Sequence, residues 1–184
     1  MKKTFKIGLM VVALVLIGGA GIFAYLGGFS SVTPEEREIG PYHVVYKEFM
    51  GPYSGVGPTM QDVATMLMGK GIESTQGIGL YYGDPKTTPA EDLRSEVGFV
   101  LTEDQVLQLG MMDPEYGLMT VEKMNVMMAE FPLKNKLSYF VGPMKAYPAI
   151  NTYRMEHNYG EMGYAMELYD LQKGMMSFMM EISK

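Results

Sequence analysis

The sequence contains no cysteine and no tryptophan, and it has only two histidines, His43 and His157. Without cysteine the chain can form no disulfide, no thiolate nucleophile and no cysteine-ligated metal site. The two histidines lie far apart and lack the spacing of a metal-binding motif, so we interpret both as structural or solvated residues. We therefore expect neither a metal nor a cofactor.

Common catalytic motifs are also missing. The sequence contains no Gly-x-Ser-x-Gly elbow, no phosphate-binding loop and no paired-glycine nucleotide fingerprint. The Asp84-Pro85 pair is typical of a turn in which the aspartate bonds to its own backbone. No nucleophile and base are therefore recognisable as a pair.

Positive charge is scarce after the first residues of the chain. Three of the fifteen basic residues precede residue 29, so residues 29–184 carry 12 basic and 21 acidic residues, a net charge of −9. A body this acidic repels phosphate backbones, which argues against a nucleic-acid partner.

The N-terminus carries a long apolar run. Residues 7–26 contain no charge and follow three lysines. A helix of this length spans about 30 Å, the thickness of the hydrocarbon core, whereas the apolar core of a signal peptide has about 7–15 residues. We expect residues 1–28 to be a single-pass anchor in the cytoplasmic membrane, with a signal peptide as the alternative. The lysines before the run and the glutamates after it predict an extracytoplasmic body.

A pattern of strand, Gly-Pro turn, helix and strand occurs twice after a linker at residues 29–40. The first copy has Gly51-Pro52 and a helix over residues 58–68, and the second has Gly142-Pro143 and a helix over residues 148–157. Such a duplication predicts an α+β fold from two β-α-β-β units, with two helices on an antiparallel sheet. Small-molecule pockets tend to lie at the seam between repeated units.

The local patterns place the other elements. Thr102 and Gln105 have the arrangement of a capping box, which predicts a short helix ending near Leu109. We expect a connector at residues 110–117. The expected strands are residues 42–50, 77–82, 96–101, 121–131, 136–141, 163–169 and 175–182.

Several of these segments carry a resemblance to a known family. Residues 77–85 read Gly-Ile-Gly-Leu-Tyr-Tyr-Gly-Asp-Pro, and residues 89–96 read Pro-Ala-Glu-Asp-Leu-Arg-Ser-Glu. Together with the strand that runs into Gly51-Pro52-Tyr53 and the later Met-Glu-Leu-Tyr at residues 166–169, they resemble the GyrI-like small-molecule-binding domain. The resemblance covers roughly residues 41–184, and the first of these segments is its most specific part.

The resemblance implies a pseudo-symmetric fold of the SHS2 type, with a groove between the two helices and the sheet. It also implies a glutamate in the late strand that faces cationic, aromatic ligands, and Glu167 is the matching position. From strand periodicity alone Glu167 could equally be an exposed carboxylate. The candidate groove walls are Tyr53, Tyr82, Tyr147 and Tyr169. The DNA-binding domain of many relatives is missing, so transcription regulation does not carry over.

Three functions stay open at this point. The first is a binding module that senses, sequesters or hands over a small cationic or amphipathic aromatic compound, with Glu167 as its counter-charge. The second is a hydrolase of small electrophiles with Glu167 as general base, which some relatives suggest. The third is an envelope interaction protein, in which residues 175–182 would dock a partner if they form an edge strand.

Overall fold

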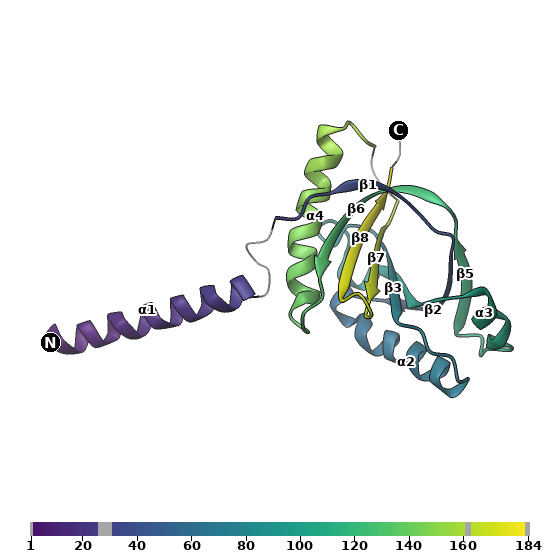
Figure 1. The fold of residues 1–184 in the computed structure, drawn as a ribbon, viewed down its shortest axis with the longest axis horizontal. Helices are drawn as coiled ribbons and strands as arrows, with labels where there is room; N and C mark the ends of the chain where they lie inside the picture. Colours follow the sequence, from purple (N-terminus) through teal and green to yellow (C-terminus); the bar gives the residue numbers. More distant parts are fainter. Residues whose placement is uncertain (1, 26–30, 161–162, 183–184) are drawn as a thin grey trace.

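The N-terminal helix projects from a folded body, which contacts it at the C-terminal end of the helix. The structure, a computed structural model, describes residues 2–25, 31–160 and 163–182 (Figure 1). Helix α1 (Lys2–Tyr25) contains a 21-residue apolar segment, Phe5–Tyr25, none of which is buried against the body. Its length and composition suit a membrane span, although a signal sequence has the same properties.

The body is built on one antiparallel sheet of eight strands. Its order is β1-β6-β8-β7-β3-β4-β2-β5. The strands are β1 (Glu35–Ile39), β2 (Tyr42–Met50), β3 (Gln76–Tyr82), β4 (Arg94–Leu101), β5 (Tyr116–Val121), β6 (Met124–Pro132), β7 (Ala165–Asp170) and β8 (Met175–Glu181). The helices of the body are α2 (Val56–Gly69), α3 (Glu103–Leu109) and α4 (Ser138–Glu156).

Two similar halves meet in the middle of this sheet. The first half is β2-α2-β3-β4 and the second is β6-α4-β7-β8, and β3 of one pairs with β7 of the other. Helix α2 contacts β2 and β4, whereas α4 contacts β6 and β8, so each helix covers its own half. The expected α+β fold with duplicated β-α-β-β units is therefore confirmed.

Two short links join the ends of the sheet. Gly40-Pro41 connects β1 to β2, and Glu122-Lys123 connects β5 to β6. In each case the two connected strands lie at or next to opposite ends of the sheet order. The links touch, because a Cβ on Gly40 would lie 2.9 Å from the carbonyl oxygen of Glu122, and Gly40 has a φ of +79° that favours glycine. The sheet therefore curls, and the face without helices buries its own apolar core, which includes Val44, Ile78, Val126 and Met166.

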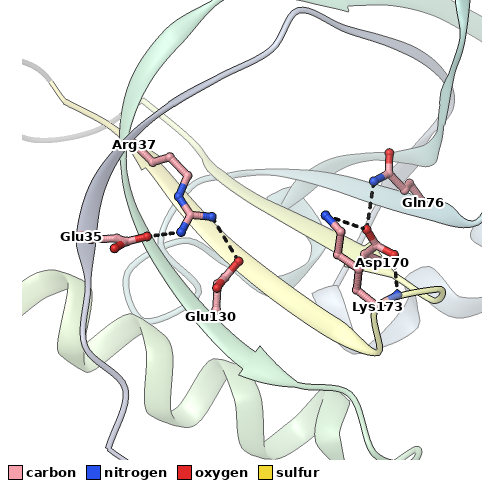
Figure 2. Close-up of polar contacts among 6 residues, drawn as sticks. All are labelled: Glu35, Arg37, Gln76, Glu130, Asp170 and Lys173. Atoms are coloured by element: carbon pink, nitrogen blue, oxygen red, sulfur yellow. Dashed lines mark hydrogen bonds and ion pairs between the residues drawn. The ribbon is translucent and has the colours of Figure 1, made fainter.

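Polar contacts hold β1 and the end of β7 (Figure 2). Arg37 on β1 bonds to Glu35 and to Glu130 on β6, where the Arg37–Glu130 contact is 3.3 Å. The buried carboxylate of Asp170 accepts hydrogen bonds from Gln76 Nε2 at 3.1 Å and from the backbone N–H of Lys173 at 2.9 Å. These bonds tie the end of β7 to β3 and close its turn into β8.

The second half differs from the sequence prediction. Gly142-Pro143 lies inside α4 rather than in a turn, residues 136–141 are not a strand, and β6 is the strand that precedes the helix. Two prolines within α4, Pro143 and Pro148, concealed the helix because each removes a backbone donor. Gly142 is required there, since its Cβ would lie 2.9 Å from the ring of Phe178 on β8.

Three further expectations are wrong. The linker at residues 29–40 contains β1, and the connector at residues 110–117 contains the start of β5. Strand β1 lies at one end of the sheet order and β5 at the other. Residues 175–182 contain β8, which pairs with β6 and β7 and is not an edge strand, so the docking role expected for it is overturned. The capping box of Thr102 and Gln105 is present and begins α3 as predicted.

We predict that Gly98→Ala strongly destabilises the body. A Cβ at Gly98 on β4 would lie 1.9 Å from the carbonyl oxygen of Val45, so the backbone must shift. We expect the free energy of unfolding to fall by about 3 kcal/mol, measured by urea denaturation. Gly57→Ala in α2 is the matched control, because nothing lies within 4 Å of its added Cβ, and it should change stability by at most about 1 kcal/mol. Equal effects would contradict the β2–β4 packing.

Candidate functional site

Glu167 lies on β7 at the seam between the two halves. Its neighbours across the strands are Gly79 on β3 and Phe178 on β8. The residue is only 8% exposed, so it is not the solvent-facing carboxylate that periodicity alone allowed. Its neighbours Met166 and Leu168 belong to the core on the opposite face of the sheet, as strand alternation predicted.

Two phenols hold the carboxylate of Glu167. The hydroxyl of Tyr147 on α4 donates to Oε1 at 2.5 Å, and the hydroxyl of Tyr169 on β7 donates to Oε2. The Tyr169 hydroxyl also lies 3.1 Å from that of Tyr81 on β3. The polar network therefore crosses the seam and connects α4, β7 and β3.

Aromatic rings extend this network. The ring of Tyr53 meets that of Tyr81 edge-on, with centroids 4.9 Å apart, and the Tyr53 hydroxyl donates to the carbonyl oxygen of Tyr82 at 2.5 Å. The ring of Tyr147 packs against Phe178 with a centroid separation of 5.5 Å. We call the tyrosines at positions 53, 81, 147 and 169, together with Glu167, the tyrosine cluster.

A glycine on β3 makes room for one ring of this cluster. A Cβ on Gly79 would lie 2.6 Å from the hydroxyl of Tyr81, whose side chain therefore lies back over its own strand. A Cβ on Gly77 would lie 3.5 Å from the ring of Tyr169. Gly79, which lies in the most specific stretch of the family resemblance, therefore leaves space beside Glu167 that Tyr81 fills, whereas the distance at Gly77 is an ordinary contact.

The cluster places a carboxylate away from water and from positive charge. Burial raises the pKa of Glu167, and the hydrogen bonds from Tyr147 and Tyr169 offset only part of that rise. Burial likewise raises the pKa of the phenols of Tyr147, Tyr169 and Tyr81, with the charge of Glu167 adding to the effect. Among the described residues, no lysine, arginine or histidine forms an ion pair with Glu167.

Tyr82 does not join the cluster, and Tyr81 takes its place. Tyr82 lies on the opposite face of β3, where its hydroxyl donates to Glu96 at 2.6 Å. The centroid of its ring lies 4.5 Å from the guanidinium carbon of Arg94. Strand alternation allows only one of the two tyrosines on the face of Glu167, and the residue on that face is Tyr81 rather than the predicted Tyr82. Of the predicted site residues, Glu167, Tyr53, Tyr147 and Tyr169 are brought together.

The other polar candidates have local roles. His43 lies 3.2 Å from the hydroxyl of Thr120, and His157 follows α4, where its Nδ1 lies 2.8 Å from the carbonyl oxygen of Tyr153. Asp84 accepts a bond from the backbone N–H of Lys86 at 2.9 Å, as expected for a turn. Within the described part of the chain, no group of three or more potential ligands could hold a metal ion.

A separate cleft of about 340 Å³ lies between the segment before β1 and the outer side of α4. Its lining includes Val32, Pro34, Ala149 and Tyr153, and it contains no member of the tyrosine cluster. The cleft and the tyrosine cluster are therefore separate features of the body.

The family model of the GyrI-like small-molecule binding domain matches residues 33–174. The chain belongs to this family. The match begins just before β1, which agrees with the inclusion of that strand in the domain. No curated protein matches the sequence.

Solved structures share the fold at low identity. The C-terminal domain of EcmrR superposes with a TM-score of 0.61 and 14% identity, covering 83% of this chain and 98% of that one. EcmrR in its DNA complex gives a TM-score of 0.58 and 11% identity, covering 100% of this chain and 70% of that one. An uncharacterised conserved protein from Listeria innocua gives 0.53 and 11%, covering 83% and 93%.

We predict that Tyr169→Phe destabilises the folded body. The change keeps the ring but removes one donor from the buried carboxylate of Glu167, so the free energy of unfolding should fall by about 1–3 kcal/mol at neutral pH. Tyr46→Phe is the control, because the Tyr46 hydroxyl has no hydrogen bond within the described residues, and it should cost no more than about 0.5 kcal/mol. Urea denaturation of both variants measures the difference, and equal losses would contradict this hydrogen-bond geometry.

We also predict a pH dependence of stability that belongs to Glu167. Its folded pKa lies above the ordinary value, so the folded state binds the proton more readily than the unfolded state. The free energy of unfolding should therefore rise, relative to Glu167→Gln, as the pH falls from neutral through the folded pKa, and level off below the unfolded pKa of about 4.3. Denaturation of both proteins across this range tests the sign. A difference that stays constant with pH would refute it.

Proposed function

We propose that the body binds a small cationic or amphipathic aromatic compound at the tyrosine cluster, with the Glu167 carboxylate as counter-charge. One observation carries the proposal. Glu167 is buried at the seam among four tyrosines, and no basic residue of the described chain pairs with it. A buried carboxylate without a cationic partner is costly, and a bound cation would lower that cost.

The composition of the cluster suits an aromatic cation. The tyrosine faces attract positive charge, and their apolar bodies offer stacking surface with few flexible torsions. A ligand must replace existing ring contacts, such as the one between Tyr53 and Tyr81. The hydroxyls of Tyr147 and Tyr169 would continue to orient the carboxylate while the ligand supplies the charge.

The setting of the body supports a role in capture rather than in transcription. If α1 is a membrane anchor, the three lysines before it place the N-terminus in the cytoplasm and the body on the extracytoplasmic side. Such a domain would sense, sequester or hand over a compound at the membrane surface. Membership of a small-molecule-binding family supports ligand capture in general.

Hydrolysis is a second candidate, and one observation favours it. The pKa of Glu167 is raised and phenol donors lie beside it, which are the two conditions for a general base acting on water next to an electrophile. Both carboxylate oxygens already accept phenol hydrogen bonds, so we rank binding first. Loss of turnover of a neutral ester in Glu167→Gln, with its binding retained, would instead establish catalysis.

We predict that the chain binds tetraphenylphosphonium and that Glu167→Gln weakens this binding at least tenfold, which is about 1.4 kcal/mol. Binding of the neutral triphenylphosphine oxide should be unaffected by the change. The affinity for the cation should also fall as the pH drops through the raised pKa of Glu167, because protonation removes the counter-charge. Calorimetric titration of the detergent-solubilised full chain measures the affinity for the cation, the affinity for the neutral compound and the pH dependence of the first.

Glu96→Gln is the matched control for this titration. Glu96 is also a buried glutamate, at 6% exposed, but it lies on the other face of the sheet and pairs with Arg94. Its replacement should leave cation affinity unchanged, provided that the thermal midpoint shows a folded protein. Equal affinities of the wild type and Glu167→Gln for the cation would refute the proposed site.

A further inference from the structure

The first turns of α4 expose an apolar surface that the body does not cover. Leu137, just before the helix, is 50% exposed, and Phe140 and Met144 are 65% and 76% exposed. Their spacing of three and four residues places them on one side of the helix. The buried residues Ser138 and Gly142 lie on the side that faces the sheet. We call Leu137, Phe140 and Met144 the α4 docking face.

Positive charge concentrates around this face. Residues 131–155 contain four basic residues and no acidic one, in a body whose net charge is −9. Lys134 and Lys136 are exposed and directly precede the face, and Lys145 follows Met144. Exposed apolar side chains flanked by lysines are the pattern of segments that lie at an anionic lipid surface.

The end of α1 lies beside the same turns of α4. The ammonium of Lys134 donates to the backbone carbonyl of Tyr25 at 3.2 Å, and that of Lys145 lies 6.0 Å from the ring centroid of Phe23. Figure 1 shows the end of α1 next to the start of α4, with the rest of the body directed away from the helix. Aromatic residues at the end of a spanning helix mark the depth of the lipid headgroups. If α1 spans the membrane, the α4 docking face therefore lies at the level where α1 leaves the bilayer.

We propose that the α4 docking face rests on a bilayer that contains anionic phospholipid. Leu137, Phe140 and Met144 enter the boundary between headgroups and acyl chains, and Lys134 and Lys136 pair with lipid phosphates. The contact to α1 makes a lipid surface the occupant that fits best, because the anchor holds this face within reach of the bilayer. A second copy of the chain is the competing occupant, and the test below separates the two.

The proposed docking also concerns ligand access, a consequence that rests on the proposed function. Tyr139, in the first turn of α4, contacts the ring of Tyr169 at a centroid distance of 5.5 Å. The first turns of α4 thus carry both the α4 docking face and a ring that contacts the tyrosine cluster, so docking would hold the cluster close to the bilayer. An aromatic cation that partitions into the headgroup region would therefore be concentrated near the cluster.

The absence of tryptophan allows a direct test. Phe140→Trp places a single tryptophan on the α4 docking face, and Leu107→Trp replaces an 82% exposed leucine on α3, a helix that lies far from α1 (Figure 1). Each full-length variant is reconstituted in nanodiscs made with brominated lipids, which quench tryptophan at the bilayer. We expect blue-shifted emission and several-fold stronger quenching at position 140 than at position 107. Equal quenching at both positions would overturn the proposal.

Two further measurements distinguish a lipid from a protein occupant of the face, and the contribution of the lysines from that of the apolar side chains. If the tryptophan of Phe140→Trp is shielded from acrylamide but not quenched by brominated lipid, a protein surface covers the face and lipid docking is refuted. In discs with phosphatidylglycerol, Lys134→Gln combined with Lys136→Gln should reduce the quenching to the level seen with phosphatidylcholine alone. Quenching that is the same in both lipids and unaffected by these changes would refute the role of the lysines. No ligand is used, so failure here is distinct from failure of ligand binding.

Discussion

A carboxylate that leaves water must be compensated by charge or by hydrogen bonds, and among the described residues Glu167 receives only hydrogen bonds. That constraint connects the two halves of the body. The donors come from Tyr147 on α4 and Tyr169 on β7, and Tyr81 on β3 bonds to Tyr169 across the seam. The position of α4 on the sheet, the pairing of β3 with β7 and the ionisation of Glu167 are therefore interdependent. Anything that neutralises the carboxylate, whether a proton or a cation, also acts on the packing of the seam.

The close approach of α4 depends on a small residue as much as on the phenol. Gly142 lets α4 pack against the ring of Phe178. The same ring contacts that of Tyr147, which lies further along α4. A larger residue at position 142 would raise the helix and withdraw the donor from Glu167. On β3, Gly79 has the corresponding function because it accommodates the side chain of Tyr81. Space at the seam is thus set by glycines, and tyrosines occupy it.

The sequence predicted the features that depend on local pattern. Periodicity predicted helix α2 and the alternation of residues on β7, and the residue pattern predicted the capping box before α3. The family resemblance identified Glu167 as the glutamate of the late strand. The prediction failed where distant residues decide. Gly142-Pro143 has the form of a turn, but contact with Phe178 places it within a helix. Strand β1 reads as a charged linker because its pairing with β6 brings together residues that are about 90 positions apart. Whether Tyr81 or Tyr82 faces Glu167 depends on that same kind of pairing.

The two buried glutamates of the sheet differ in how their charge is compensated. Glu96 and Glu167 are nearly equally buried, and each accepts a hydrogen bond from a tyrosine. Glu96 also pairs with Arg94, whose guanidinium lies over the ring of Tyr82, so its charge is neutralised within the protein. Glu167 has comparable aromatic surroundings but no such arginine among the described residues. An external aromatic cation at Glu167 would reproduce the arrangement that Arg94 already makes at Glu96, which is the physical reason for proposing a binding site on the helix-covered face.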